Sequence, residues 1–282
     1  MFAALRKLGL GRKSSEDVSV DMTDFVPALP EGERVYAIGD VHGRIDLLNE
    51  LLQLIDEDDE RRGPARTTLI LLGDLVDRGP HSASVVERAI RLHAASDRFH
   101  AIKGNHEEVM LAALAGDDAA MRLFLRIGGI QTLESYGVSL DDLPPGDELD
   151  TMMQRMQAAI PREHADYLAA MADRVAMGDY LFVHAGVRPG VPIDRQDPVE
   201  QRWIRDSFLD HEGSHGVMVV HGHSITDQPT LRPNRMGIDT GAYYSGVLTA
   251  LGLEGTDHWL LQTRPHGGED DGENDGAVPA EA

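Results

Sequence analysis

Five short apolar segments of the chain each end in aspartate, asparagine or histidine beside a glycine. The first three end in "GDVHG" (39–43), "GDLVDRG" (73–79) and "GNHE" (104–107), and histidines follow the other two in "HAG" (184–186) and "VHGHS" (220–224). Carboxylate, imidazole and amide oxygen are ligands that suit Mn²⁺, Fe or Zn²⁺, and glycine lets the backbone turn close to a ligand. One such motif alone could be a polar turn, but five together indicate a metal site.

The candidate ligands are numerous enough for two metal ions that share one carboxylate. One set is Asp40, His42 and Asp74, and the other is Asp74, Asn105, His184 and either His221 or His223. Two ions about 3.5–4 Å apart can clamp the attacking and leaving oxygens of an in-line displacement. Alternation along a strand does not choose between His221 and His223, because residues two apart point to the same face. Gly222 allows a turn just before His223 and favours that residue as the ligand.

The pattern of apolar residues predicts the elements that carry the first three motifs. Strands are expected at 34–40, 67–74 and 98–104, with helices at 44–57 and 82–95 between them. Such alternation implies parallel strands, whose carboxyl ends hold the ligand crevice in α/β folds.

The rest of the chain is expected to divide into a helical insertion, further strands and two tails. The insertion covers about 107–176, with interruptions at Gly128–Gly129 and 143–148, and strands resume at 180–186, 216–223, 246–253 and 258–263. The hairpin-like spacing of these later strands predicts a mixed sheet. We therefore expect one domain over 33–264, an N-terminal tail over 1–32, and an acidic, glycine-rich, disordered tail over 265–282.

Composition excludes several classes of protein. The 282 residues include 48 acidic and 26 basic ones, for a formal charge of −22, which disfavours nucleic acid as a partner. No cysteine is present, so thiolate ligands and cysteine nucleophiles are excluded. No segment approaches the roughly 20 apolar residues of a membrane span. The start of the chain does not resemble a secretory signal, so a cytoplasmic protein is expected; the first 15 residues are expected to be a frayed tail or else an amphipathic surface helix.

The five motifs, in this order, resemble those of the metallophosphoesterase superfamily. The resemblance covers about residues 33–263 and is greatest to its phosphoprotein phosphatase family, in particular the bacterial and phage-type serine/threonine phosphatases. It implies an α/β fold, namely a mixed β-sandwich flanked by helices with a helical insertion (the calcineurin-like fold). It also implies two divalent metal ions, with Mn²⁺ expected and Fe or Zn²⁺ as alternatives. The implied ligands are Asp40, His42, Asp74, Asn105, His184 and His223.

The same resemblance implies roles for residues that do not bind metal. His106 would protonate the leaving oxygen, and Asp77 would orient it. Arg78 would bind phosphate oxygens. Arg205, in "RWIRD" (202–206), would be a second phosphate-binding arginine, unless it forms a surface ion pair with Asp206 or a neighbour. Lys103 stands where many members of the family have arginine, which could weaken phosphate binding.

The expected function is hydrolysis of phosphomonoesters by a metal-activated water. The expected substrate is phosphoserine or phosphothreonine in a protein, with phosphotyrosine or a small phosphoester as further options. One alternative is hydrolysis of a symmetrical dinucleoside tetraphosphate, and another is a non-catalytic binding protein with the same fold. The segment "LRIGGIQTLESYGV" (125–138) could form a lid over the substrate or simply pack through Leu125, Leu133 and Tyr136, and it does not discriminate between these substrates.

Overall fold

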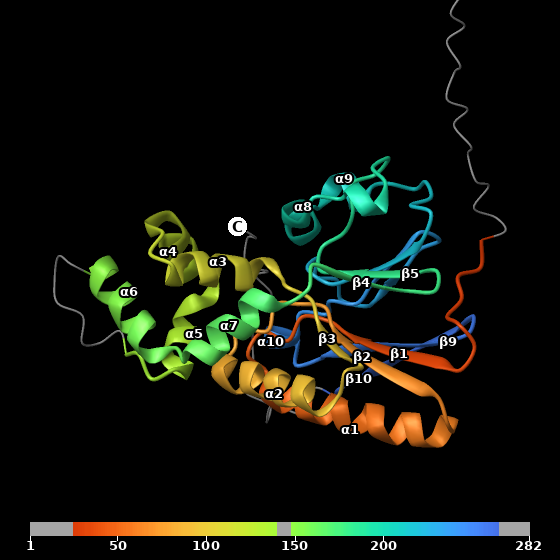
Figure 1. Ribbon diagram of the computed structural model, residues 1–282, viewed down its shortest axis with the longest axis horizontal. Coiled ribbons are helices and arrows are strands. Elements are labelled where there is room, and N and C mark those ends of the chain that lie inside the picture. Colours follow the sequence, from red (N-terminus) through yellow and green to blue (C-terminus); the bar gives the residue numbers. More distant parts are fainter. Residues whose placement is uncertain (1–24, 140–147, 265–282) are drawn as a thin grey trace, which may run out of the picture.

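A computed structural model describes residues 25–139 and 148–264, in which two five-stranded sheets face each other (Figure 1). The first sheet has the order β10-β9-β1-β2-β3 and the second the order β4-β5-β6-β8-β7. The strands of the first sheet are β1 (Glu33–Ile38), β2 (Arg66–Leu71), β3 (Phe99–Ala101), β9 (Thr249–Glu254) and β10 (Asp257–Gln262). Those of the second are β4 (Arg174–Met177), β5 (Tyr180–Val183), β6 (Met218–His221), β7 (Thr230–Leu231) and β8 (Arg235–Gly237).

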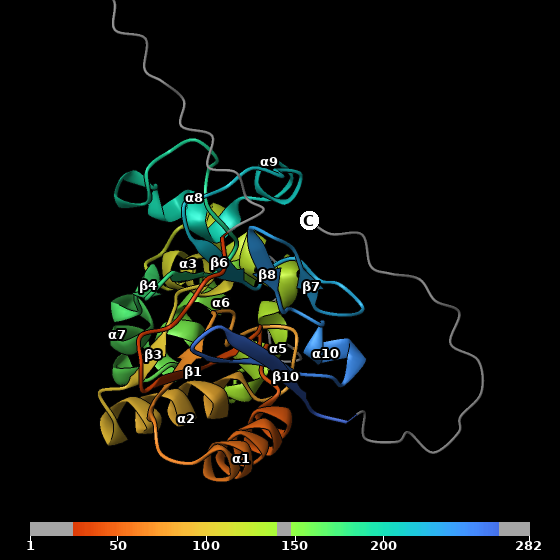
Figure 2. The same cartoon turned by 90° about the vertical axis from the view of Figure 1, so that its right-hand side faces the viewer.

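Helices cover the outer faces of both sheets and form a lobe at one end. In both views α1 (Ile45–Arg62) and α2 (Ser82–Ala95) lie outside the first sheet, whereas α8 (Pro198–Trp203) and α9 (Asp206–Leu209) lie outside the second (Figures 1 and 2). The lobe contains α3 (Asn105–Leu114), α4 (Asp118–Phe124), a π-helical turn (Leu125–Gly129), α5 (Ile130–Ser135), α6 (Glu148–Ala159) and α7 (Arg162–Ala170). A short 3₁₀ turn (Ile193–Arg195) precedes α8, and α10 (Ala242–Ser245) precedes β9.

The alternation of side chains along the strands explains why the layers stack in this order. On β1, Val35 and Ala37 belong to the core between the two sheets, whereas Tyr36 and Ile38 face the helices. Successive residues of a strand point to opposite faces, so a strand that is apolar throughout is buried on both sides. Helix α1 covers this outer face with buried leucines at helical spacing, namely Leu47, Leu48, Leu51 and Leu52.

The structure confirms the predicted fold, and the parallel pairing of the first three strands is as expected. β1 pairs parallel with β2 and β2 with β3, while β9 pairs antiparallel with both β1 and β10. β4 begins at Arg174, two residues before the expected end of the helical insertion. The short strands β7 and β8 lie in a region where the sequence predicted none. None of the described helices is both long and apolar enough to cross a membrane.

Part of the expected N-terminal tail packs against the domain. Leu29 is 5% exposed in the core between the sheets, and its backbone N–H donates to the carbonyl of Gly255. The amide of Ala28 donates to the carboxylate of Asp179. Residues 25–32 therefore belong with the domain, whereas the rest of the N-terminal tail, the C-terminal tail and most of the expected 143–148 loop lie outside the described residues.

Candidate metal centre and active site

The candidate site residues lie at the ends of strands from both sheets. Asp40 and His42 follow β1, Asp74 follows β2, and His184 follows β5. Asn105 begins α3 just after β3, and His223 follows β6. Because β1, β2 and β3 are parallel, as are β5 and β6, their carboxyl ends meet at the same edge of each sheet.

Asp74 is shared by two groups of side chains that could each hold a metal ion. One group is His42, Asp74 and His106, the other is Asp74, His184 and His223, and the ligand atoms within each lie within 4.8 Å of one another. One carboxylate oxygen of Asp74 is 3.6 Å from Nε2 of His42, and the other is 3.4 Å from Nε2 of His184. Asn105 joins the second group, because its Oδ1 lies 3.0 Å from ring nitrogens of both His184 and His223.

The imidazoles of His42 and His184 are oriented as in metal sites. Nδ1 of His42 donates to the carbonyl of Val76, and Nδ1 of His184 to that of Leu72, each at 2.8 Å. Nε2 of each ring is therefore unprotonated, and its lone pair faces Asp74. Metal-bound histidines are usually held in this way, with the other ring nitrogen donating to a carbonyl or carboxylate. Burial lowers the pKa of His42 well below its usual value and also lowers that of His184, so both rings are held neutral. The donor set therefore fits divalent metal ions.

Asp40 is held beside this cluster rather than inside either group. Its carboxylate accepts the backbone N–H of His223 at 3.0 Å, and a Cβ on Gly222 would collide with it. Burial, followed by the charges of Asp239 and Asp74, raises the pKa of Asp40 well above its usual value. A buried carboxylate is stabilised by a nearby cation, so Asp40 remains a proposed ligand.

The backbone of the site adopts left-handed conformations that side chains disfavour. Among the described residues, the non-glycine residues with positive φ all belong to the candidate site. They are His42 (44°), Asp74 (49°), Asp77 (70°), Arg78 (66°) and His223 (63°). Such angles persist only where the surrounding structure imposes them, and they cluster at functional sites.

His106 is joined to Asp77 and, through it, to Thr132. Nδ1 of His106 lies 2.7 Å from Oδ2 of Asp77, and Thr132 donates its hydroxyl to Oδ1 of Asp77 at 2.7 Å. Burial would lower the pKa of His106, but the carboxylates of Asp74 and Asp77 raise it above the usual value. The ring is thus held in a fixed orientation and in a form able to carry a proton. Thr132 was not identified from the sequence, although it lies in the 125–138 segment.

Residues of the 125–138 segment hold the turn that contains Arg78. The amide of Arg78 donates to the carbonyl of Gly128 at 3.0 Å. Gly128 has φ of 116°, and a Cβ there would lie 2.7 Å from the backbone nitrogen of Arg78. The segment packs as one alternative had proposed, with Leu133 buried, but it also positions site residues directly.

Glu107 is a further functional residue for which sequence reasoning proposed no role. Its buried carboxylate accepts the backbone N–H groups of Asp74, Leu75, Val76 and Gly104 at 2.7–3.3 Å. It therefore fastens the turn after β2 to the start of α3. Its place in "GNHE" marked the motif, but three of its four partners lie some thirty residues away, and only the fold reveals them.

An open cleft of about 720 Å³ leads to the cluster. Its walls include the two proposed phosphate-binding arginines, Arg78 and Arg205, and also four residues for which the sequence suggested no function: Arg126, Trp203, Tyr243 and Tyr244. Nε of Arg205 lies 3.2 Å from Nε2 of His223, and the guanidinium of Arg78 lies 4.9 Å from the ring centre of Tyr243. Lys103 does not line the cleft, and its Nζ donates to the carbonyl of Ala169.

Replacing His223 by alanine should reduce the metal content of the purified protein from two ions per chain to one. His223 faces Asn105 in the cluster, whereas Nδ1 of His221 donates to the carbonyl of Gly222 and its ring packs on Phe208. His221→Ala should therefore keep both ions. Elemental analysis of the two variants after dialysis against Mn²⁺ tests this, and the opposite pattern would make His221 the ligand.

Curated relatives of the chain are named as tetraphosphatases. Over 177 residues it is 33% identical to the symmetrical bis(5'-nucleosyl)-tetraphosphatase of Paracidovorax citrulli, covering 63% of this chain but only 48% of the relative. It is 27% identical over 234 residues to the asymmetrical bis(5'-nucleosyl)-tetraphosphatase of Anoxybacillus flavithermus, covering 76% of this chain and 88% of the relative. The chain thus spans about half the length of the first of these relatives.

Solved structures share the fold. A crystal structure provisionally named a diadenosine tetraphosphatase superposes with a TM-score of 0.57 at 21% identity, covering 84% of this chain and 98% of that one. A cold-active protein tyrosine phosphatase superposes with a TM-score of 0.54 at 17% identity, covering 83% and 81%. The sequence profile of the calcineurin-like phosphoesterases matches residues 33–246, and with the donor cluster at the strand ends this match establishes that the chain belongs to the calcineurin-like phosphoesterase family.

Proposed function

We propose that the chain hydrolyses dinucleoside tetraphosphates to two nucleoside diphosphates at a centre of two divalent metal ions. The observation that carries the proposal is the composition of the cleft. Its floor is the donor cluster around Asp74, and its walls combine three arginines with three large aromatic side chains: Arg78, Arg126 and Arg205, and Trp203, Tyr243 and Tyr244.

This combination suits a ligand with several phosphates and a base at each end. Guanidinium groups bind phosphate oxygens in pairs, and aromatic rings stack on nucleobases. The chain has an excess of 22 negative charges, so arginines gathered around one cleft give an anionic substrate a local place to bind. The names of the curated relatives support the same substrate class.

The chemistry follows from the positions of the chain's own residues. Divalent ions, when bound by the donor cluster, would lower the pKa of water and neutralise phosphate charge. Arg78 would hold the phosphate oxygens beside the donor cluster. The oxygen of water forms a bond to phosphorus as the bridging P–O bond breaks, and the proton that this water loses passes to solvent. The leaving diphosphate oxygen takes a proton from Nε2 of His106. Asp77 keeps that ring oriented through Nδ1.

A comparison of substrates tests the proposal. With Mn²⁺ present, kcat/KM for diadenosine tetraphosphate should exceed that for phosphoserine and phosphotyrosine peptides by at least about tenfold, a difference of roughly 1.4 kcal/mol. Chromatography should find ADP as the nucleotide product. ATP with AMP would instead indicate asymmetrical cleavage, faster turnover of a phosphopeptide would favour a protein phosphatase, and no turnover of any substrate would favour a non-catalytic binding protein.

A further inference from the structure

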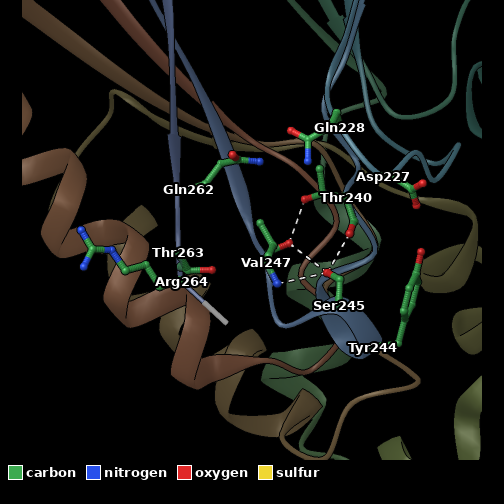
Figure 3. A pocket seen from close by; sticks show the side chains of 9 residues that line it. All are labelled: Asp227, Gln228, Thr240, Tyr244, Ser245, Val247, Gln262, Thr263 and Arg264. Atoms are coloured by element: carbon green, nitrogen blue, oxygen red, sulfur yellow. Dashed lines mark hydrogen bonds between the residues drawn. The ribbon is translucent and has the colours of Figure 1, made fainter. Parts of the chain in front are cut away.

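A second hollow lies beside the catalytic cleft. This lateral pocket, drawn in Figure 3, has a volume of about 370 Å³. It is lined by Asp227, Gln228, Thr240, Tyr244, Ser245, Val247, Gln262, Thr263 and Arg264. Asp227 and Tyr244 also line the catalytic cleft, so the two hollows meet at these residues.

We propose that the lateral pocket binds one nucleobase of a dinucleoside polyphosphate whose phosphates lie at the metal centre. The proposal rests on the proposed function and specifies where one end of that substrate is held. The class of ligand is a purine, for reasons that follow from the lining residues.

A short series of ring contacts connects the metal centre to the lateral pocket. The ring of Tyr243 lies 5.6 Å from that of His42 and 5.0 Å from that of Tyr244, measured between centroids. Tyr243 also lies under the guanidinium of Arg78. Tyr243 thus contacts both Arg78, the proposed phosphate-binding group, and Tyr244, which lines the lateral pocket.

The wall of the lateral pocket is held rigidly by hydrogen bonds of the turn around α10. The hydroxyl of Ser245 donates to the carbonyl of Thr240 at 2.7 Å and accepts the amide of Val247 at 3.0 Å. The hydroxyl of Thr240 donates to the carbonyl of Val247 at 2.8 Å. These bonds, dashed in Figure 3, give a preformed site, and its volume is within the range of about 300–1,000 Å³ that is usual for small-molecule pockets.

The groups that we assign to base recognition are two carboxamides and one ring. Nε2 of Gln262 donates to the hydroxyl of Thr249 at 2.9 Å, which fixes the direction of its amide, and Gln228 extends from a different segment of the lining (Figure 3). A glutamine amide can pair with both N6 and N7 of adenine. Tyr244 is 55% exposed and offers a face on which a base can stack. Two amides beside a tyrosine ring thus favour a purine over a peptide side chain.

The test compares two substrates, only one of which has nucleobases. In Gln262→Leu the ratio of kcat/KM for diadenosine tetraphosphate to kcat/KM for p-nitrophenyl phosphate should fall by about tenfold, mainly through KM, because the variant loses the amide that can pair with a base. Replacing the exposed Gln228 by leucine should also lower this ratio. Gln53→Leu, a matched change on the exposed surface of α1, should leave the ratio unchanged.

The possible outcomes test the lateral pocket and the proposed function separately. Circular dichroism first checks that Gln262→Leu is folded, because this variant also loses the bond to Thr249; if it is not folded, Gln228→Leu decides. An unchanged ratio in the folded variants would overturn the lateral pocket while leaving the proposed function intact. An unaltered protein that hydrolyses p-nitrophenyl phosphate but not diadenosine tetraphosphate would overturn the proposed function, and the lateral pocket with it.

Discussion

His106→Asn should lower kcat for phenyl phosphate by roughly 10²–10⁴-fold, the range that general acid catalysis contributes. Nδ1 of His106 is 2.7 Å from Asp77, and Nε2 is 3.3 Å from a guanidinium nitrogen of Arg78. The ring is therefore fixed next to the proposed phosphate-binding group, where it can protonate a leaving oxygen. Steady-state kinetics on phenyl and p-nitrophenyl phosphates measure the effect, and the loss should be smaller for p-nitrophenyl phosphate because its leaving group needs less protonation.

Metal analysis shows whether the lower kcat of His106→Asn comes from loss of a general acid or from loss of a metal ligand. The side chain is also part of one group that could hold an ion, with Nε2 3.8 Å from a carboxylate oxygen of Asp74. We expect His106→Asn to retain two ions per chain, and the exposed His258→Asn to match the unaltered protein throughout. Loss of an ion would make His106 a metal ligand, whereas equal losses on the two esters would contradict its role as the acid.

Removing the metal ions should abolish phosphoesterase activity, with a fall of about 10³-fold or more, and Mn²⁺ should restore it. The ions are expected to contribute several kcal/mol to the stabilisation of transition-state charge. Without the ions, the proposed ligands His42, His184 and His223 are neutral imidazoles beside the buried carboxylate of Asp74, which repels a phosphate. Treatment with a strong chelator, followed by gel filtration, elemental analysis and assay, tests this.

Restoring activity with Mn²⁺ shows whether the chelated protein lost only its metal ions or also its folded structure. The chelated protein should keep its circular dichroism spectrum, and activity should rise with added Mn²⁺ until about two ions are bound per chain. Full turnover by protein that elemental analysis finds free of metal would contradict the proposed chemistry. Parallel titrations with Zn²⁺ and Fe²⁺ would rank the candidate metals.

The part of the site that the sequence predicted well is the part that lies at strand ends. Buried strands can be recognised as short apolar runs, and the polar residue that follows each run is then placed by the topology alone. For this reason Asp74, Asn105, His184 and His223 could be expected together from positions more than a hundred residues apart, and the structure brings their side chains into one cluster.

The residues that were missed act through partners distant in sequence. Thr132 reaches Asp77 only because α5 packs against α2 and the turn after β2. Tyr244 and Trp203 could not be distinguished from core aromatics, since short helices of four and six residues show no clear periodicity. The strands β7 and β8 have two and three residues, too few for alternation to be visible.

The left-handed backbone angles of the site limit how stable a working form of this protein can become. Each of the five side-chain-bearing residues with positive φ costs on the order of 1–3 kcal/mol, against a total of about 5–15 kcal/mol for a typical domain. Glycine would relieve much of this strain but would remove the side chains proposed to bind metal, to orient His106 and to bind phosphate. Attempts to raise the melting temperature should therefore leave these turns unchanged and alter exposed positions such as those on the outer surface of α1.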